Sequence, residues 1–294
     1  MNKIVALLIA LAAFAVQPAT AQTPDATVWR ALDPENTLYV DTRHGRVVVE
    51  LYPEIAPRHV EQVKTLAAQK FYDGLKFHRV IENFMAQGGD PKGDGTGASS
   101  LPDIPGEFIF RRGMDMPFIE AAFQGGARIG FYKALPIVSQ PDQMMTITKD
   151  GKASAWGLHC PGVASMARGE DPNSANSQFF LMRAAYPSLD KRYTIWGRVI
   201  WGQDAVMKLA VGEPPTNPDV MTQVRLASDL PASERAPIYV MRSESPEFRK
   251  VIDETRKARG ADFSVCDVQI PVRVPRTKDD NKKERPWWRV IPLL

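Results

Sequence analysis

The feature that most constrains the fold of this chain is a succession of short apolar segments, each bounded by glycine, proline, asparagine or aspartate. Short segments rich in β-branched and aromatic side chains are typical of β-strands. They cover residues 38–41, 46–51, 77–81, 144–148, 153–156, 162–167, 177–182, 193–201 and 220–227. In the same region the pattern predicts only a helix over 57–69 and a short helix over 204–209. We therefore expect a mainly β fold, an antiparallel sheet that closes on itself and is capped by helices, because closure removes exposed strand edges.

The first 21 residues have the features of a secretory signal peptide. Lys3 precedes an apolar run over residues 4–16, and the sequence Ala-Thr-Ala that ends at Ala21 fits the small-x-small rule for cleavage. The alternative is a retained membrane anchor, but the run is shorter than the ~20 residues that a spanning helix needs. We expect cleavage after Ala21 and a mature protein that is exported and free of the membrane. In a Gram-negative bacterium that compartment is the periplasm.

Composition and periodicity divide the rest of the chain into three regions. Residues 22–36 are polar and punctuated by proline, and we interpret them as a linker. Residues 37–228 contain the strand-rich domain, which is interrupted by a stretch of weak periodicity over residues 113–158. We interpret this stretch as an insertion, which either forms a wall or lid beside a binding groove or decorates a distant surface.

Residues 229–294 differ in character and predict an α/β extension. Ser245 has the features of a helix N-cap, with proline at the first helical position, and Gly260 ends the predicted helix. Residues 263–274 alternate like a strand, with a shift of parity that suggests a bulge.

Several classes of function are disfavoured by what the chain lacks. Its net charge is only +3, with both signs spread along the sequence, which argues against nucleic-acid binding. The glycine-rich stretch over residues 88–97 lacks the Lys-Ser/Thr ending of a phosphate loop. No metal-ligand spacing is found at the four histidines, which are His44, His59, His78 and His159. We therefore expect no metal and no cofactor.

The two cysteines, Cys160 and Cys266, leave two alternatives open. In an oxidising compartment an even pair can be bridged, but two buried free thiols fit the sequence equally well. Neither cysteine lies in a stretch that offers histidine and aspartate partners, so a thiol nucleophile is not expected.

Two stretches, residues 71–91 and 162–197, contain the residues best suited to chemistry. The first places one arginine, Arg79, among apolar side chains and amides. The second adds further aromatic and amide groups around Gln178 and Phe180. Together they offer neither a nucleophile–base pair nor a carboxylate dyad. This inventory suits a reaction in which no bond to carbon is made or broken, such as rotation about a peptide bond.

The same two stretches resemble the cyclophilin family of peptidyl-prolyl cis-trans isomerases. The matching motifs are F-H-R-V-I-x-x-F-M-x-Q-G-G-D-P and S-M-A-R-x-x-D-P-x-S-A-x-S-Q-F-F, and G-R-V-I at residues 197–200 is similar to a third family segment. The M-A-R-x-x-D-P variant looks like bacterial members. The resemblance covers roughly residues 38–227 apart from the insertion. It implies a closed eight-stranded antiparallel β-barrel capped by two α-helices, with a peptide groove on its outer face.

Carried over by position, the resemblance assigns a role to each site residue. Arg79 matches the catalytic arginine. The matches to the proline pocket are Phe84, Met85, Phe180 and Leu189. Gln87 and Gln178 match polar groups near the substrate carbonyl, and Ala167 and Arg168 match the segment whose backbone pairs with residues before proline.

The chemistry of the reaction is consistent with an arginine at this place. The barrier to peptide rotation is ~18–20 kcal/mol because the C–N bond has partial double-bond character. A guanidinium aimed at the prolyl nitrogen stabilises a pyramidal lone pair that appears only when this resonance is broken. It therefore binds the transition state more strongly than the ground state, as catalysis requires.

Two positions of the groove depart from the common family pattern. Many relatives carry tryptophan where this chain has Ser188, and many carry histidine where it has Tyr193. Tyr193 also occurs in some bacterial members. Ser188 opens the rim of the groove, so we expect weak or no cyclosporin binding while the proline pocket stays intact.

The sequence thus predicts a prolyl isomerase that acts on proline-containing polypeptides during the folding of exported proteins, with a monomer favoured. The alternative is a peptide-binding chaperone or scaffold that uses the insertion and the C-terminal extension and has little turnover. A hydrolase would need a nucleophile that the motifs do not offer.

Overall fold

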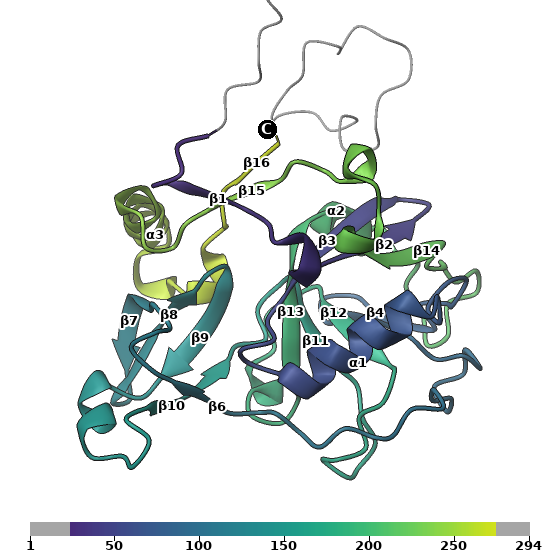
Figure 1. Cartoon of the computed structure of the whole chain (residues 1–294), viewed down its shortest axis with the longest axis horizontal. Helices are drawn as coiled ribbons and strands as arrows, with labels where there is room; N and C mark the ends of the chain where they lie inside the picture. The colour runs from purple at the N-terminus through teal and green to yellow at the C-terminus, as the bar shows by residue number, and fades with distance from the viewer. Residues whose placement is uncertain (1–23, 275–294) are drawn as a thin grey trace, which may run out of the picture.

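The computed structural model describes residues 24–274, so the expected signal peptide and the last part of the C-terminal extension lie outside the described residues. Its largest unit is an eight-stranded antiparallel sheet with strand order β14-β2-β3-β13-β11-β12-β5-β4 (Figure 1). In chain order these strands are β2 (Thr37–Thr42), β3 (Gly45–Leu51), β4 (Arg79–Ile81), β5 (Met85–Gly88), β11 (Val163–Met166), β12 (Phe179–Met182), β13 (Ile195–Trp201) and β14 (Gln223–Leu226).

The edges of this sheet are β14 and β4, and no ladder of the described residues pairs the two strands with each other. The segments before them do approach, because an antiparallel bridge joins Lys76 to Val220 and the Phe77 N–H donates to the Asp219 carbonyl at 2.8 Å. The sheet is therefore a curled half-barrel. The complete closure that we expected is not shown.

Two helices accompany the large sheet, α1 (Pro57–Ala68) and the short α2 (Gln203–Met207), close to the predicted ranges. The buried face of α1 includes Val60, Val63 and Leu66, which pack in one cluster with side chains of the sheet such as Trp196. This core fills the concave side of the sheet and leaves the opposite face of β4, β5 and β12 for other contacts.

The predicted insertion and the three residues before it form a separate sheet, with strand order β6-β10-β9-β8-β7. Its strands are β6 (Phe110–Arg112), β7 (Ile119–Gln124), β8 (Ala127–Tyr132), β9 (Leu135–Ser139) and β10 (Ala153–Gly157). Strand β10 confirms the segment expected over residues 153–156, whereas the weak periodicity concealed β7, β8 and β9. One expected strand, residues 144–148, is wrong, since Asp142–Thr146 is a 3-10 turn whose first residue is paired with Arg112 and Arg128.

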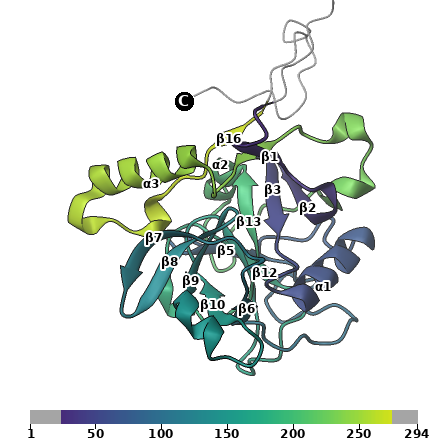
Figure 2. The ribbon, with the colours of Figure 1, turned by 60° about the vertical axis from the view of Figure 1, so that its left-hand side comes forward.

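The two ends of the described chain pack beside this inserted sheet. β1 (Trp29–Ala31), β15 (Tyr239–Met241) and β16 (Val272–Arg273) form a small sheet with β15 in the centre. The segment over residues 22–36, which we expected to be a linker, thus contributes a strand paired with the C-terminal extension. Helix α3 (Pro246–Arg259) begins at the N-cap Ser245 as predicted and lies against β7 and β8 (Figures 1 and 2).

The long strand predicted over residues 263–274 is mostly wrong. Only Val272 and Arg273 are in a strand, and Val265–Asp267 is a 3-10 turn. The Ser264 hydroxyl accepts a hydrogen bond from the Cys266 N–H, and the Asp267 carboxylate accepts one from the Ser264 N–H. These local side-chain bonds compete with strand pairing.

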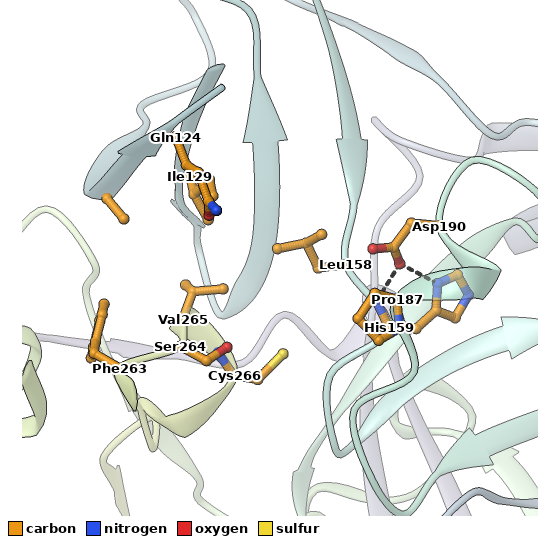
Figure 3. Close-up of a pocket in the computed structure, with 11 residues that line it drawn as sticks. Gln124, Ile129, Leu158, His159, Pro187, Asp190, Phe263, Ser264, Val265 and Cys266 are labelled. Carbon is orange, nitrogen blue, oxygen red and sulfur yellow. Dashed lines mark hydrogen bonds and ion pairs between the residues drawn. The ribbon is translucent and has the colours of Figure 1, made fainter. Parts of the chain in front are cut away.

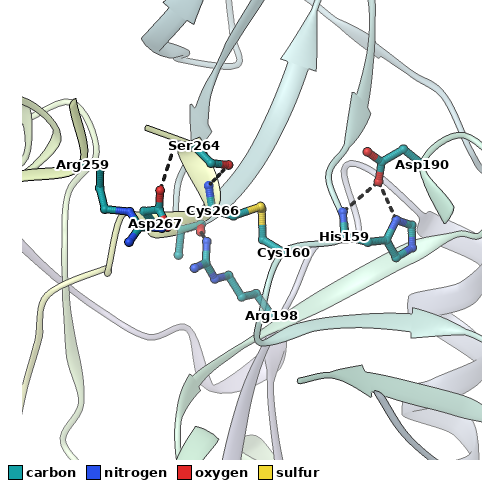
Figure 4. Close-up of a disulfide and its surroundings, with 9 residues drawn as sticks. His159, Cys160, Asp190, Arg198, Arg259, Ser264, Cys266 and Asp267 are labelled. Carbon is teal, nitrogen blue, oxygen red and sulfur yellow. Dashed lines mark hydrogen bonds and ion pairs between the residues drawn. A yellow bond between two sulfur atoms is a disulfide. The ribbon is translucent and has the colours of Figure 1, made fainter. Parts of the chain in front are cut away.

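A disulfide and a buried ion pair connect the terminal segments to the large sheet. Cys160 and Cys266 are bonded, so the bridged alternative is the one observed (Figure 4). In the second connection, Arg30 of β1 donates two hydrogen bonds to the buried Glu50 of β3, at 2.5 and 2.8 Å. The insertion and both terminal segments therefore form one body, tethered to the sheet that bears the candidate site.

Candidate active site

One row of side chains crosses the convex face of three neighbouring strands. In the β4–β5 ladder Arg79 lies opposite Gln87, and in the β5–β12 ladder Gln87 lies opposite Phe180. Residues directly opposite each other in an antiparallel ladder point to the same face. The register therefore places the guanidinium, the amide and the aromatic ring side by side, although they come from both of the sequence stretches singled out above.

Hydrogen bonds connect the polar members of this row. The Arg79 guanidinium donates through Nη1 to Gln87 Oε1 at 3.5 Å, and Gln87 Nε2 donates to Gln178 Oε1 at 2.9 Å. Gln178 in turn donates to the carbonyls of Gly95 and Gly97, at 3.0 and 2.8 Å. The glycine-rich segment thus serves as a backbone anchor for the two glutamines, which hold each other in fixed orientations.

The predicted apolar pocket residues gather next to this row in one packed cluster. Met85, Phe180 and Leu189 are buried, while Phe84 and Tyr193 are half-buried and pack against them. The rings of Phe180 and Tyr193 meet edge to face, with 5.7 Å between centroids. We name the apolar surface formed by these five side chains, with Arg79 at its border, the recess; its role as a proline pocket stays a prediction.

The two predicted backbone-pairing residues lie at the end of β11. The Ala167 N–H donates to the Gln178 carbonyl at 2.9 Å, so this donor is already engaged within the protein. The Arg168 guanidinium lies 4.6 Å from the centroid of the Tyr193 ring and donates to the Arg192 carbonyl. Arg168 therefore supports the Tyr193 side of the recess rather than the Arg79 side.

Two residues that the sequence analysis did not single out lie in direct contact with the predicted site. The ring of Tyr186 packs on the ring of Phe84, with 4.4 Å between centroids. The Glu213 carboxylate accepts a hydrogen bond from Arg79 Nε at 2.6 Å. Tyr186 lies two residues before the noted Ser188 and could have been considered as a replacement wall, but nothing in the sequence around Glu213 pointed to Arg79.

Behind the recess lies a serine–histidine–aspartate arrangement that resembles a hydrolase triad. His159 Nδ1 lies 2.8 Å from Asp190 Oδ1, and His159 Nε2 lies 3.1 Å from Ser165 Oγ. Ser165 is fully buried, and its hydroxyl donates to the Thr194 carbonyl at 2.9 Å. A nucleophile without access to substrate cannot act, so these groups are structural. The His159 ring stacks at 6.2 Å against Phe180 and supports the recess from behind.

A cavity of about 270 Å³ lies on the far side of this histidine (Figure 3). Its lining comes from the β7–β8 hairpin, from the loops around His159 and Asp190, and from the turn that contains Cys266. The cavity therefore lies at the interface of the insertion, the C-terminal extension and the large sheet. It is separate from the row that contains Arg79.

The inserted sheet approaches the site near Tyr193. Lys191 lies two residues from both Leu189 and Tyr193 in the sequence. Its ammonium group is 3.6 Å from the ring centroid of Trp156 on β10. A small gap is lined by Phe110 of β6 together with Tyr193. The inserted sheet thus adjoins the Tyr193 end of the recess.

The described residues contain no helix that is both long enough and apolar enough to cross a membrane. Within the same residues no three histidine, cysteine or carboxylate side chains converge in a way that could hold a metal ion.

Comparison with known proteins decides the family. The model of the "Cyclophilin type peptidyl-prolyl cis-trans isomerase/CLD" family matches residues 37–228. The chain belongs to the cyclophilin-type peptidyl-prolyl cis-trans isomerases. Its large sheet and α1 are accordingly a cyclophilin fold, and the chain is an enzyme of that class.

Individual cyclophilins match beyond the family core. A probable peptidyl-prolyl cis-trans isomerase of Brucella suis biovar 1 is 34% identical over 240 residues, which cover 76% of this chain and 94% of the relative. The crystal structure of cyclophilin AquaCyp293 from Hirschia baltica is similar with a TM-score of 0.79 and 38% identity, covering 86% of this chain and 96% of the other. Because this coverage exceeds the matched family region, the similarity extends into the added segments.

Proposed function

We propose that this cyclophilin accelerates rotation about Xaa-Pro bonds of exported polypeptides, with Arg79 as the catalytic residue. The observation that supports this most is the position of Arg79 at the border of the apolar recess, with its side chain 40% exposed. Its recorded acceptors are Glu213 and Gln87, which take one N–H each. A guanidinium has five N–H donors. Three of them are thus without an acceptor among residues 24–274 and can reach a bound peptide.

In this mechanism the recess holds the proline ring and the chain before it rotates. Met85, Phe180 and Leu189 offer a buried apolar surface to the ring, and Phe84 and Tyr193 border it. Partial exclusion of water strengthens the interaction of the guanidinium with the prolyl nitrogen. No group needs to give up or accept a proton, in keeping with the absence of an accessible nucleophile in the described part of the site.

The test is the isomerisation rate of an Xaa-Pro tetrapeptide with the Arg79→Ala variant. One charge-assisted hydrogen bond in the transition state corresponds to about 10- to 100-fold in kcat/KM, and we expect a loss of this size. Arg58→Ala is the matched control, since Arg58 is an exposed arginine of α1, away from the recess. An unchanged rate in Arg79→Ala would refute the arginine mechanism while leaving the family assignment intact.

The cellular role that we propose is assistance to folding in an oxidising compartment outside the cytoplasm. The disulfide between Cys160 and Cys266 supports this, because structural disulfides persist in such compartments. Sequencing of the mature N-terminus tests the export step, with Gln22 expected as the first residue. A mature protein that still begins at Met1 would contradict it.

A chaperone-like role is the second candidate, and one observation favours it. The insertion exposes three large apolar side chains, Met114, Phe123 and Ile147. Suppression of aggregation by Arg79→Ala, at the level of the unaltered protein, would support peptide holding that is independent of turnover. If aggregation is suppressed only by the active enzyme, isomerisation is the function.

A further inference from the structure

The loop after α2 adds a short piece of strand to the open edge of the site sheet. The backbone groups of Val80 and Gly212 exchange two hydrogen bonds, each of 2.8 Å, which makes an antiparallel bridge outside β4. In an antiparallel arrangement the residue before Val80 lies opposite the residue after Gly212. The bridge therefore places Glu213 directly across from Arg79, at the end of the row formed by Arg79, Gln87 and Phe180.

Gly212 makes this close approach possible. Its φ of +153° lies in a region that side chains disfavour. A Cβ at this position would also lie 2.5 Å from the Cα of Pro215. The backbone around Glu213 is thus tightly folded, and the carboxylate is presented from a fixed place.

Glu213 makes the shorter of the two contacts that hold the Arg79 guanidinium. The Nε–Oε2 distance is 2.6 Å, whereas the distance from Nη1 to Gln87 is 3.5 Å, the limit of a hydrogen bond. Arg79 lies on an edge strand of only three residues, and an arginine side chain loses considerable rotamer entropy when it is fixed. Glu213 binds at Nε and Gln87 at Nη1, and the terminal Nη2 group has no hydrogen-bond acceptor among residues 24–274.

We propose that Glu213 is a positioning residue that holds the Arg79 guanidinium in its catalytic orientation. The proposal rests on the proposed role of Arg79. The opposite effect, a carboxylate that weakens the field of the arginine, is physically possible but small here. Both side chains are exposed, 40% for Arg79 and 52% for Glu213, so water screens their charges. Water does not screen the effect of Glu213 on the orientation of the Arg79 guanidinium. The loss of this orientation should therefore dominate the effect of removing Glu213 on the rate.

The test is a double-mutant cycle on tetrapeptide isomerisation, with Glu213→Ala, Arg79→Ala and the combined variant. An exposed ion pair of this kind corresponds to a loss of about two- to fivefold, which we expect in kcat/KM for Glu213→Ala. In the Arg79→Ala background the same substitution should cause no further loss, because a residue that acts through Arg79 has nothing left to position. Glu82→Ala is the matched control. It removes an exposed carboxylate three residues from Arg79 that makes no hydrogen bond or ion pair in the described structure.

The orientation of Arg79 can also be measured directly by NMR. The Nε–Hε resonance of Arg79, assigned by its absence from Arg79→Ala, should be protected from solvent exchange in the unaltered protein and in Glu82→Ala. It should exchange faster in Glu213→Ala.

Each outcome separates the two proposals. If Arg79→Ala leaves the rate unchanged, the arginine mechanism fails and the role of Glu213 fails with it. If Arg79→Ala is impaired but Glu213→Ala is equal to or faster than the unaltered enzyme, only the positioning role fails. An equal loss from Glu213→Ala in both backgrounds, with unchanged Nε–Hε exchange, would assign Glu213 a purely structural role and overturn the proposal.

Discussion

The ring of Tyr186 packs against the ring of Phe84 in a tilted arrangement, with 4.4 Å between ring centroids and 43° between the ring planes. Tyr186 is exposed, whereas Phe84 is half-buried and packs against the recess. The tyrosine therefore extends the apolar surface of the recess outward, close to Ser188, where the sequence had suggested an open rim.

We expect Tyr186→Ala to weaken substrate binding more than turnover. An aromatic contact of this kind, with its buried area, contributes about 1–2 kcal/mol, which corresponds to a rise of roughly 5- to 30-fold in KM. Tyr186→Phe keeps the ring and should restore most of the affinity. The measurement is the KM and kcat of both variants with one proline peptide. A fall in kcat at constant KM would argue against a role in binding.

The row of Arg79, Gln87 and Phe180 was predictable because two contiguous motifs supply it. Arg79, Met85 and Gln87 lie on one hairpin, so the local sequence fixes their mutual register. Phe180 joins them through the β5–β12 ladder; the resemblance placed both motifs in one groove without specifying this pairing. Glu213, in contrast, reaches Arg79 through a bridge between residues 132 positions apart, Val80 and Gly212. A single sequence contains no local signal for such a pairing.

The added segments were harder to predict for a related reason. Strands β7 and β8 are partly exposed, and some of their side chains are buried by packing against α3. Phe131 of β8, for example, packs against Phe248 of α3 with 5.1 Å between ring centroids. Their pattern of burial depends on a partner more than a hundred residues away, so it does not follow a simple alternation. β1 was missed because a three-residue strand becomes stable only when it pairs with β15.

We expect Glu50→Gln to destabilise the protein strongly. The carboxylate accepts two hydrogen bonds from Arg30 and one from the Tyr52 hydroxyl, at 2.9 Å, and it is buried. Removing one member of a buried pair leaves its partner uncompensated, which costs about 3–5 kcal/mol. Urea unfolding measures the loss, with Glu61→Gln on the exposed face of α1 as a control expected to change stability by less than about 0.5 kcal/mol. Similar midpoints for the two variants would contradict this role of Glu50.

The disulfide should contribute to stability through the length of chain that it closes. Cys160 and Cys266 are 106 residues apart, and a loop of that size corresponds to about 4–5 kcal/mol in the chain-entropy model. We expect the Cys160→Ser/Cys266→Ser variant to melt at a lower temperature and to be cleaved first within the C-terminal extension under limited proteolysis. A reductant should lower the melting temperature of the unaltered protein but not that of the variant. Equal melting temperatures for both proteins without reductant would rule out a stabilising role.

His78 should make the stability of the fold depend on pH in weakly acidic solution. Burial lowers the pKa of its imidazole. The nearby Asp90 and Asp94 oppose this shift, and the charge of Arg79 adds to it. Neither ring nitrogen has a hydrogen-bond partner in the described structure, so the neutral ring is buried without compensation for a charge.

The direction of the effect follows from the proton balance. The unfolded chain takes up a proton near pH 6.5, whereas folded His78 resists protonation until a lower pH. The contribution of neutral His78 to the free energy of unfolding is therefore fully present above about pH 6.5. It falls as the pH drops below this value, by at most about 1.4 kcal/mol per pH unit. Urea unfolding at pH 7.5 and pH 5.5 measures this loss, and His78→Gln should reduce it because glutamine does not titrate. If the variant and the unaltered protein lose the same stability between these two pH values, His78 is not the responsible group.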